Sequence, residues 1–201
     1  MDSIAWLLFV VANHETGVRI PFPAPTKDYI MYVEQKRNMM GSLKAFDRDD
    51  HNTYDDKGKQ ALIEFLNRKL KNKSIENPNK YGIDILTVNE YNQVVHCWEV
   101  EVRYGNWKGD VEFPYREINC IERKDYQWRK DQELFDKIPL EVASDVKVTY
   151  VQLNNECNRA VFIDGNTILH YPLKPWANRK SSNEYVRQVP IRETLQVKIS
   201  P

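Results

Sequence analysis

The chain has few cysteines, few glycines and no excess of charge of either sign. Its 201 residues include 7 glycines and 3 cysteines, and 29 lysines and arginines balance 29 aspartates and glutamates. Cys97, Cys120 and Cys157 lie far apart in strand-like apolar stretches, with no CxxC or paired Cys/His spacing. This pattern is typical of packed free thiols in a reducing cytosol and argues against a structural zinc site. A zero net charge gives no support to general nucleic-acid binding, although locally basic faces remain open.

Several catalytic and membrane motifs are also absent. No Gly-rich phosphate loop, GxSxG elbow or HExxH helix occurs, and the four histidines are scattered. His96 is therefore expected to be a packed or surface residue. An apolar run at residues 4–12 is too short to span a bilayer, and Asp2 without a preceding Lys or Arg is the wrong start for a secretory signal. We expect no membrane partner and a cytoplasmic location.

Composition divides the chain into an N-terminal extension and one domain. Residues 1–40 combine the apolar run with Pro21, Pro23 and Pro25, which prevent regular structure and indicate an extended linker. Residues 41–201 are long enough to bury a core and are predicted to form an α/β domain, with a central mixed sheet flanked by helices.

Periodicity places the secondary structure within this domain. A helix is predicted over residues 57–71, with apolar residues at helical spacing. Two strands at 83–88 and 94–104 are joined by a turn of hairpin length. A tight turn is expected at 164–166. Further strands are predicted at 116–124, 146–153, 160–163, 167–170 and 185–189, and a weaker helix at 130–138.

The stretch from Tyr81 to Tyr104 carries acids where strands usually carry none. Asp84 interrupts the apolar run 83–86, and aspartate is disfavoured in strands. On the next strand, the side-chain period of two places Glu99 and Glu101 on one face, where they repel unless a cation, a proton or water lies between them. Neighbouring strands lie about 5 Å apart, so Asp84 can share a hard cation such as Mg²⁺ with Glu99. The alternative for the two glutamates is the solvated face of an antiparallel strand.

This order of acids resembles the motif of the PD-(D/E)xK nuclease superfamily, in the D…ExE form that some type II restriction endonucleases use. The resemblance covers about residues 55–163 and implies a restriction endonuclease-like αβββαβ core. It implies phosphodiester hydrolysis that depends on Mg²⁺, or on Mn²⁺ in its place, with Asp84 and Glu99 as metal ligands. Glu101 takes the place of the family lysine and would position or activate the attacking water. Glu64 matches the acid that the family's first helix often supplies; a solvated helix residue is its other interpretation.

Two positions depart from the family pattern. Ile83 stands where proline is frequent, and the lysine of the ExK motif is missing, with Lys108 and Lys124 as candidates to replace it. The segment after the motif interleaves basic with aromatic residues, which respectively contact phosphates and stack on unpaired bases. Nearby acids nearly cancel its charge, so a solvated surface is the alternative. The residues predicted to bind nucleic acid are Arg116, Arg123, Lys124, Arg129 and Lys130.

The sequence therefore predicts a Mg²⁺-dependent nuclease of αβββαβ type. Its expected partner is DNA, contacted through the phosphate backbone, and a homodimer is one candidate assembly. The alternative function is a catalytically inactive α/β module that binds nucleic acid or a protein.

Overall fold

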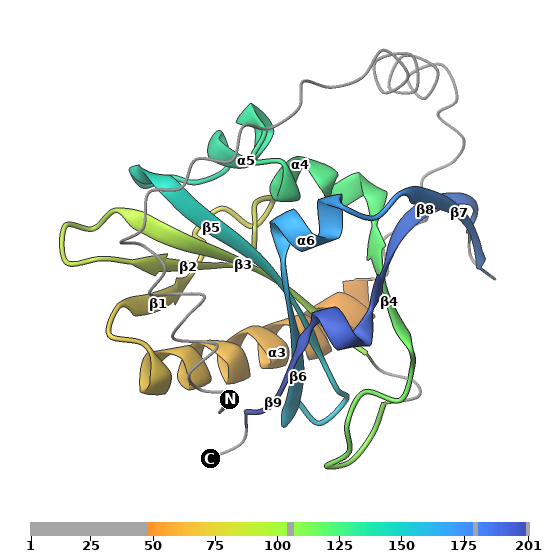
Figure 1. Cartoon of the computed structure of the whole chain (residues 1–201). Coiled ribbons are helices and arrows are strands. Elements are labelled where there is room, and N and C mark those ends of the chain that lie inside the picture. The colour runs from red at the N-terminus through yellow and green to blue at the C-terminus, as the bar shows by residue number, and fades with distance from the viewer. Residues whose placement is uncertain (1–47, 104–106, 179–180, 200–201) are drawn as a thin grey trace. The chain divides into compact units, whose positions relative to one another are not determined.

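A long helix, α3 (Arg48–Lys69), packs across one face of the main sheet in the computed structural model, which describes residues 48–103, 107–178 and 181–199 (Figure 1). The buried side chains of Leu62, Phe65 and Leu66 confirm the predicted apolar stripe. A Cβ atom at Gly58 would lie 2.5 Å from Val102 Cγ2, so glycine lets the helix approach the sheet closely. The predicted extension at residues 1–40 lies outside the described residues.

The main sheet has six strands and is mixed, which confirms the predicted α/β class. Its strands in spatial order are β1 (Lys73–Glu76), β2 (Ile85–Val88), β3 (Val94–Val102), β5 (Val142–Leu153), β6 (Arg159–Asp164) and β9 (Leu195–Lys198). Strands β1, β2 and β3 form an antiparallel meander, β5 is parallel to β3, and β6 and β9 continue antiparallel.

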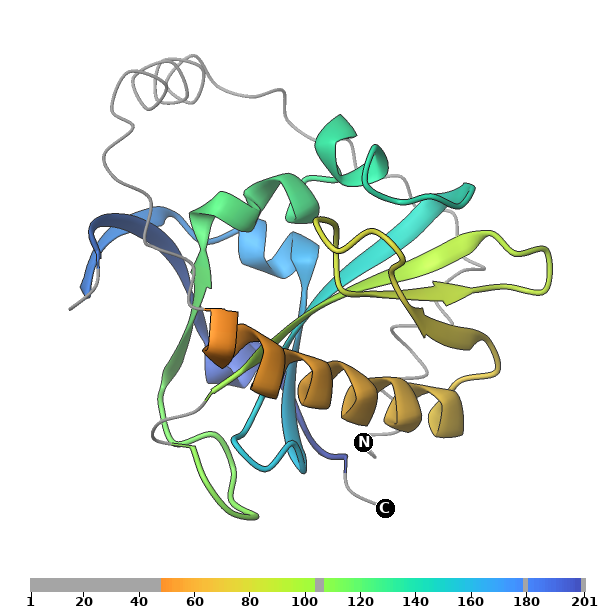
Figure 2. The ribbon, with the colours of Figure 1, turned by 180° about the vertical axis from the view of Figure 1, so that it is seen from behind.

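Helices cover both faces of this sheet (Figures 1 and 2). The face opposite α3 is covered by α4 (Asp125–Trp128), α5 (Gln132–Phe135) and α6 (Gly165–Leu169). A second sheet lies beside them, with β4 (Glu117–Ile121), β8 (Ser181–Pro190) and β7 (Leu173–Asn178) in that order. Two short 3₁₀ helices are η1 (Glu122–Lys124), after β4, and η2 (Ile191–Glu193), before β9.

Several predicted elements differ from the structure. The strand predicted at 116–124 forms as β4, but it pairs with β8 in the second sheet and ends in η1. The strand β1, which was not predicted, completes the three-stranded meander of the main sheet. The strand predicted at 167–170 is wrong: the side chain of Asp164 accepts a hydrogen bond from the amide of Thr167 and caps α6 there.

Residues expected to be packed are packed. All three cysteines are buried and free of disulfides. His96 stacks on Trp98 with ring centroids 3.8 Å apart and shares a 2.8 Å hydrogen bond with Thr149 Oγ1. Burial, followed by the repulsion of nearby lysines, lowers the pKa of His96 to about 3, so it is neutral at physiological pH.

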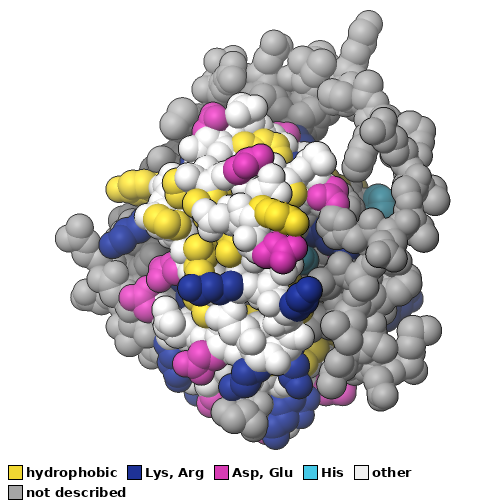
Figure 3. All heavy atoms as spheres, turned by 90° about the vertical axis from the view of Figure 1, so that its left-hand side faces the viewer, with side chains coloured by type: hydrophobic (Ala, Val, Ile, Leu, Met, Phe, Trp, Pro, Cys, Tyr) yellow, Lys and Arg dark blue, Asp and Glu magenta, His cyan; other side chains and the backbone are white. Residues whose placement is uncertain are grey.

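The helices of the described residues include none long and apolar enough to cross a membrane. On the face at the left of Figure 1, acidic and basic side chains are interspersed over the described part, with no field of one sign (Figure 3). This distribution agrees with the zero net charge of the chain.

Candidate active site

Asp84 lies immediately before β2, and its carboxylate accepts a hydrogen bond from the backbone of β3. The β2–β3 ladder stops at the pair Ile85 and Trp98. Two residues further along β3, the amide of Val100 donates to Asp84 Oδ2 at 2.8 Å. An aspartate is therefore accommodated in this apolar run because it precedes the strand and satisfies a β3 amide that has no partner on β2. Its side chain remains 20% exposed.

Glu99 lies in the middle of β3 and is only 4% exposed. Lys124 Nζ donates a short hydrogen bond to its Oε1, and Gln127 Nε2 donates to its Oε2 at 2.9 Å. Burial, followed by the repulsion of Asp84, raises the pKa of Glu99 to about 7, against the opposing effect of Lys124. The carboxylates of Asp84 and Glu99 therefore lie within electrostatic range of each other.

Lys124 is the cation that faces these acids. It ends η1, directly after β4, and its side chain is 26% exposed. Burial lowers its pKa, but the attractions of Glu99, Asp84 and Glu101 outweigh burial, and the resulting pKa lies well above the ordinary value for lysine. Of the two candidates for the missing lysine, the structure thus brings Lys124 to the acids. Lys108 is exposed in the loop after β3.

Glu101 is held by a tyrosine from the neighbouring strand. Tyr150 OH donates to Glu101 Oε2 at 2.5 Å, and Gln152 Nε2 donates to the tyrosine oxygen at 2.9 Å. Burial, followed by the charge of Glu101, raises the pKa of Tyr150 well above its ordinary value, so the phenol stays protonated and remains a donor. Glu101 therefore has a fixed orientation on the same face of β3 as Glu99.

The structure does not bring Glu64 to this cluster. Its side chain is exposed on α3, and α3 packs against the face of β3 that carries Val100 and Val102 rather than the glutamates. The helix contributes Lys59 instead, whose Nζ lies 3.7 Å from Asp84 Oδ1. Lys59 was missed in the sequence, although its place next to Gly58 and three residues before Leu62 puts it at the packed side of the helix.

The basic residues predicted to contact nucleic acid have different environments. Arg116 and Arg123 are exposed. Lys124 lies among the acids, and Arg129 donates to a buried carboxylate of α4 at 3.1 Å. Lys130 is half-buried in a backbone conformation with φ of 56°. Only the first two thus present their charge mainly to solvent.

The described residues contain no group of three or more His, Cys, Asp or Glu side chains that could hold a metal ion. Mg²⁺ is commonly held by only one or two carboxylates, with water and substrate phosphate completing its shell. The pair Asp84 and Glu99 fits that requirement in donor chemistry, because both supply hard oxygens and they lie close enough to repel. Lys124 and Lys59 offset their charge in the metal-free protein.

The buried Glu99 gives a testable pH dependence in the metal-free protein. As the pH rises from about 4 to about 7 in EDTA, the free energy of unfolding of the wild type is expected to fall relative to that of Glu99→Gln. The folded pKa of about 7 exceeds the unfolded value of about 4.3, so the folded state binds the extra proton. The resulting stabilisation is complete below the unfolded pKa and is lost as pH rises through the folded pKa. Urea unfolding of both proteins across this window measures the difference, and parallel pH profiles would contradict it.

Comparisons with known proteins gave no match: no protein-family model, no curated protein and no solved structure is significantly similar to the chain.

Proposed function

We propose that the protein is a Mg²⁺-dependent nuclease that hydrolyses phosphodiester bonds in DNA. The observation that carries the proposal is the position of Lys124, whose ammonium donates to Glu99 Oε1 and lies within electrostatic range of Asp84 and Glu101. Residues from just before β2, from β3 and from η1 thus lie around one ammonium group. The acids are the three of the D…ExE resemblance, and Lys124, from a later segment, is a candidate to replace the lysine that this form lacks.

The order of elements supports the same proposal. Helix α3 precedes the meander β1–β2–β3, and helices α4 and α5 precede β5, which pairs in parallel with β3. This α-β-β-β-α-β order is like that of a PD-(D/E)xK core, but β1 takes the place of the strand predicted at 116–124, which forms β4 in the second sheet. The free cysteines favour a cytoplasmic location, since buried unpaired thiols are usual in reducing compartments.

Each side chain of the cluster has a role in the proposed reaction. Asp84 and Glu99 would hold the Mg²⁺ ion, which when bound supplies Lewis-acid stabilisation of the phosphate and a more acidic water. Lys124 remains charged at neutral pH and offsets the negative charge that the phosphate gains during attack. Glu101, oriented by Tyr150, accepts the proton of the attacking water.

A binding module without catalysis is the second candidate, and one observation favours it. Lys124 and Lys59 already pair with Glu99 and Asp84, so the cluster is stabilised without any metal. In that case the ion pairs would serve to join α3, β2, β3 and η1, and the protein would bind nucleic acid or another protein without cleaving it.

Incubation of the full chain with supercoiled plasmid tests the two candidates. Cleavage is expected with Mg²⁺ or Mn²⁺, and none is expected with EDTA. Single-stranded and branched DNA are included because the cluster does not define the form of the substrate. DNA binding with no cleavage of any substrate, together with no shift of the melting temperature on adding Mg²⁺, would overturn the nuclease proposal and favour the binding module.

A further inference from the structure

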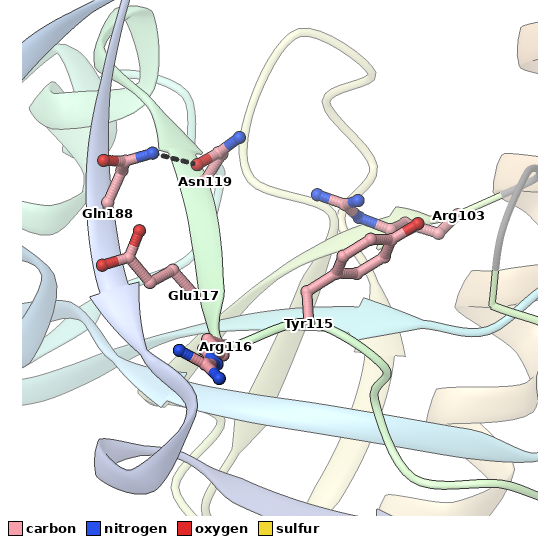
Figure 4. A pocket seen from close by; sticks show the side chains of 6 residues that line it. All are labelled: Arg103, Tyr115, Arg116, Glu117, Asn119 and Gln188. Atoms are coloured by element: carbon pink, nitrogen blue, oxygen red, sulfur yellow. Dashed lines mark hydrogen bonds between the residues drawn. The ribbon is translucent and has the colours of Figure 1, made fainter.

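A polar pocket lies between the end of β3 and the outer face of the second sheet (Figure 4). Its volume is about 380 Å³, which falls in the range of ligand sites. Arg103 comes directly after β3, where its amide donates to the carbonyl of Leu153 at 2.9 Å, and it lies two residues, about 7 Å, beyond Glu101. The pocket therefore adjoins the candidate active site. It is lined by Arg103, Tyr115, Arg116, Glu117, Asn119 and Gln188.

A chain of hydrogen bonds fixes which atom Asn119 presents to the pocket. Lys174 Nζ donates to Gln188 Oε1 at 3.1 Å, and Gln188 Nε2 donates to Asn119 Oδ1 at 3.3 Å. A lysine can only donate, so the orientation of both amides follows from it. The acceptor of Asn119 is used within the sheet, and its Nδ2 donor points away from Gln188 toward the side of the pocket where Arg103 lies (Figure 4).

Arg103 is held by aromatic rings. Its guanidinium carbon lies 5.5 Å from the ring centroid of Phe113 and 5.6 Å from that of Tyr115. Its Nε is buried and has no hydrogen-bond partner in the described residues. Buried polar groups are nearly always hydrogen-bonded, so the described residues do not satisfy all the donors of this guanidinium. The ring contacts fix the plane of a donor group at the wall of the pocket.

The polar groups of the pocket select the chemistry of its ligand. Arg103, Arg116 and Asn119 offer donors, whereas Glu117 is an exposed acceptor that suits a ligand carrying donors as well as acceptors. Guanine carries acceptors at O6 and N7, which suit an arginine, and donors at N1 and N2, which suit a carboxylate. Adenine is matched less well, because an asparagine that reads adenine needs its acceptor as well as its donor. Tyr115 adds an aromatic surface of the kind on which unpaired bases stack.

We propose that this pocket binds an unpaired guanine of the nucleic-acid strand close to the phosphate that is cleaved. The proposal rests on the proposed nuclease function, since it takes the bound strand to pass the acid cluster. It assigns strand recognition to the second sheet, which is separate from the six-stranded main sheet.

The test measures binding of labelled thymidine oligonucleotides that carry one central guanine, adenine, cytosine or no substitution. The full chain is used in EDTA, so that no cleavage occurs. The wild type is expected to bind the guanine oligonucleotide about tenfold more tightly than the others. Asn119→Ala and Glu117→Ala, both at the surface of the sheet, are expected to remove this preference. Arg123→Ala is the matched control, because loss of an exposed cation outside the pocket weakens binding to all four equally.

Equal affinity for the four oligonucleotides would overturn the proposal, as would a guanine preference that survives both pocket variants. Loss of binding on adding inorganic phosphate, with no base preference, would instead identify an anion site and also overturn it. Cleavage of the same oligonucleotides in Mg²⁺ separates the two proposals. Cleavage without a base preference rejects the guanine pocket alone, and a base preference without cleavage rejects the nuclease alone.

Discussion

Replacing Glu99 with glutamine is expected to lower the rate of Mg²⁺-dependent DNA cleavage by about 10³-fold or more. The side chain keeps its size, and its carbonyl oxygen still accepts a hydrogen bond from Lys124. A neutral amide, however, is a poor ligand for a hard divalent cation. A 10³-fold loss corresponds to about 4 kcal/mol of transition-state stabilisation, which is within the several kcal/mol that a bound metal supplies.

This result requires that the variant remains folded. Burial and Asp84 raise the pKa of Glu99, so its ionised form destabilises the metal-free protein at neutral pH. Replacing it with a neutral amide removes this destabilisation. The thermal midpoint of Glu99→Gln in EDTA is therefore expected to equal or exceed that of the wild type. Plasmid cleavage rates and melting curves are measured on the same preparations. An inactive variant with a greatly lowered midpoint would point to a structural role for Glu99.

Two further glutamates serve as controls for this substitution. Glu90→Gln changes an exposed residue of the β2–β3 turn and is expected to keep the wild-type rate. Glu64→Gln tests whether Glu64 is an additional catalytic acid, as the resemblance predicts, or a solvated helix residue, as its exposure indicates. Glu64 is exposed on α3, and α3 packs on the face of the sheet opposite the one that carries Glu99 and Glu101. The Glu64→Gln variant is therefore also expected to keep the wild-type rate. A loss in Glu64→Gln equal to that in Glu99→Gln would contradict the position of Glu64 away from the acid cluster.

The sequence pattern predicted those parts of the site that depend on local structure. The hairpin of β2 and β3 follows from alternation and turn length, and it brings Asp84 next to the strand that carries Glu99. Lys124 could be named as a candidate because it stands at the end of the next predicted strand, at 116–124. Its actual approach depends on β4 leaving the main sheet and turning back through η1, and no periodicity encodes that path.

The partners of Glu101 could not be predicted for a related reason. Tyr150 reaches Glu101 because β5 pairs in parallel with β3, in a register that sets Glu99 opposite Tyr150 and Glu101 opposite Gln152. Tyr150 and Glu101 are 49 positions apart in the sequence. Parallel pairing is specified by the packing of both faces of a sheet, and the local pattern of a strand does not determine its neighbour.

Replacing Arg187 with methionine is expected to lower the free energy of unfolding by about 3–5 kcal/mol, the range for breaking a buried ion pair. The Asp125 and Arg187 side chains are 8% and 10% exposed. Arg187 Nε and Nη2 both donate to the carboxylate, with Nη2 2.7 Å from Asp125 Oδ2. Its Nη1 donates to the carbonyl of Tyr171. Methionine fills similar space but leaves Asp125 charged, buried and short of donors.

Arg129→Met is the matched control, because it removes another donor to the same carboxylate. Arg129 Nη2 lies 3.1 Å from Asp125 Oδ2, but its side chain is 22% exposed and the pair is spaced four residues apart on the chain. Such partly solvated pairs contribute about 1 kcal/mol or less. Urea unfolding of the two variants compares these values, and equal losses would show that burial does not distinguish the two arginines.

Arg187 also connects stability to the proposed chemistry. Asp125 directly follows Lys124 in the chain, so the bond from β8 to Asp125 fixes the start of α4 and the end of η1. Loosening that anchor lets the ammonium of Lys124 move away from Asp84, Glu99 and Glu101, and misplacement of such a group by about 1 Å can cost 10²-fold in rate. Under conditions where Arg187→Met remains folded, its cleavage rate is therefore expected to fall about 10²-fold, while Arg129→Met keeps most of its activity. Wild-type cleavage by folded Arg187→Met would show that Lys124 does not depend on this anchor.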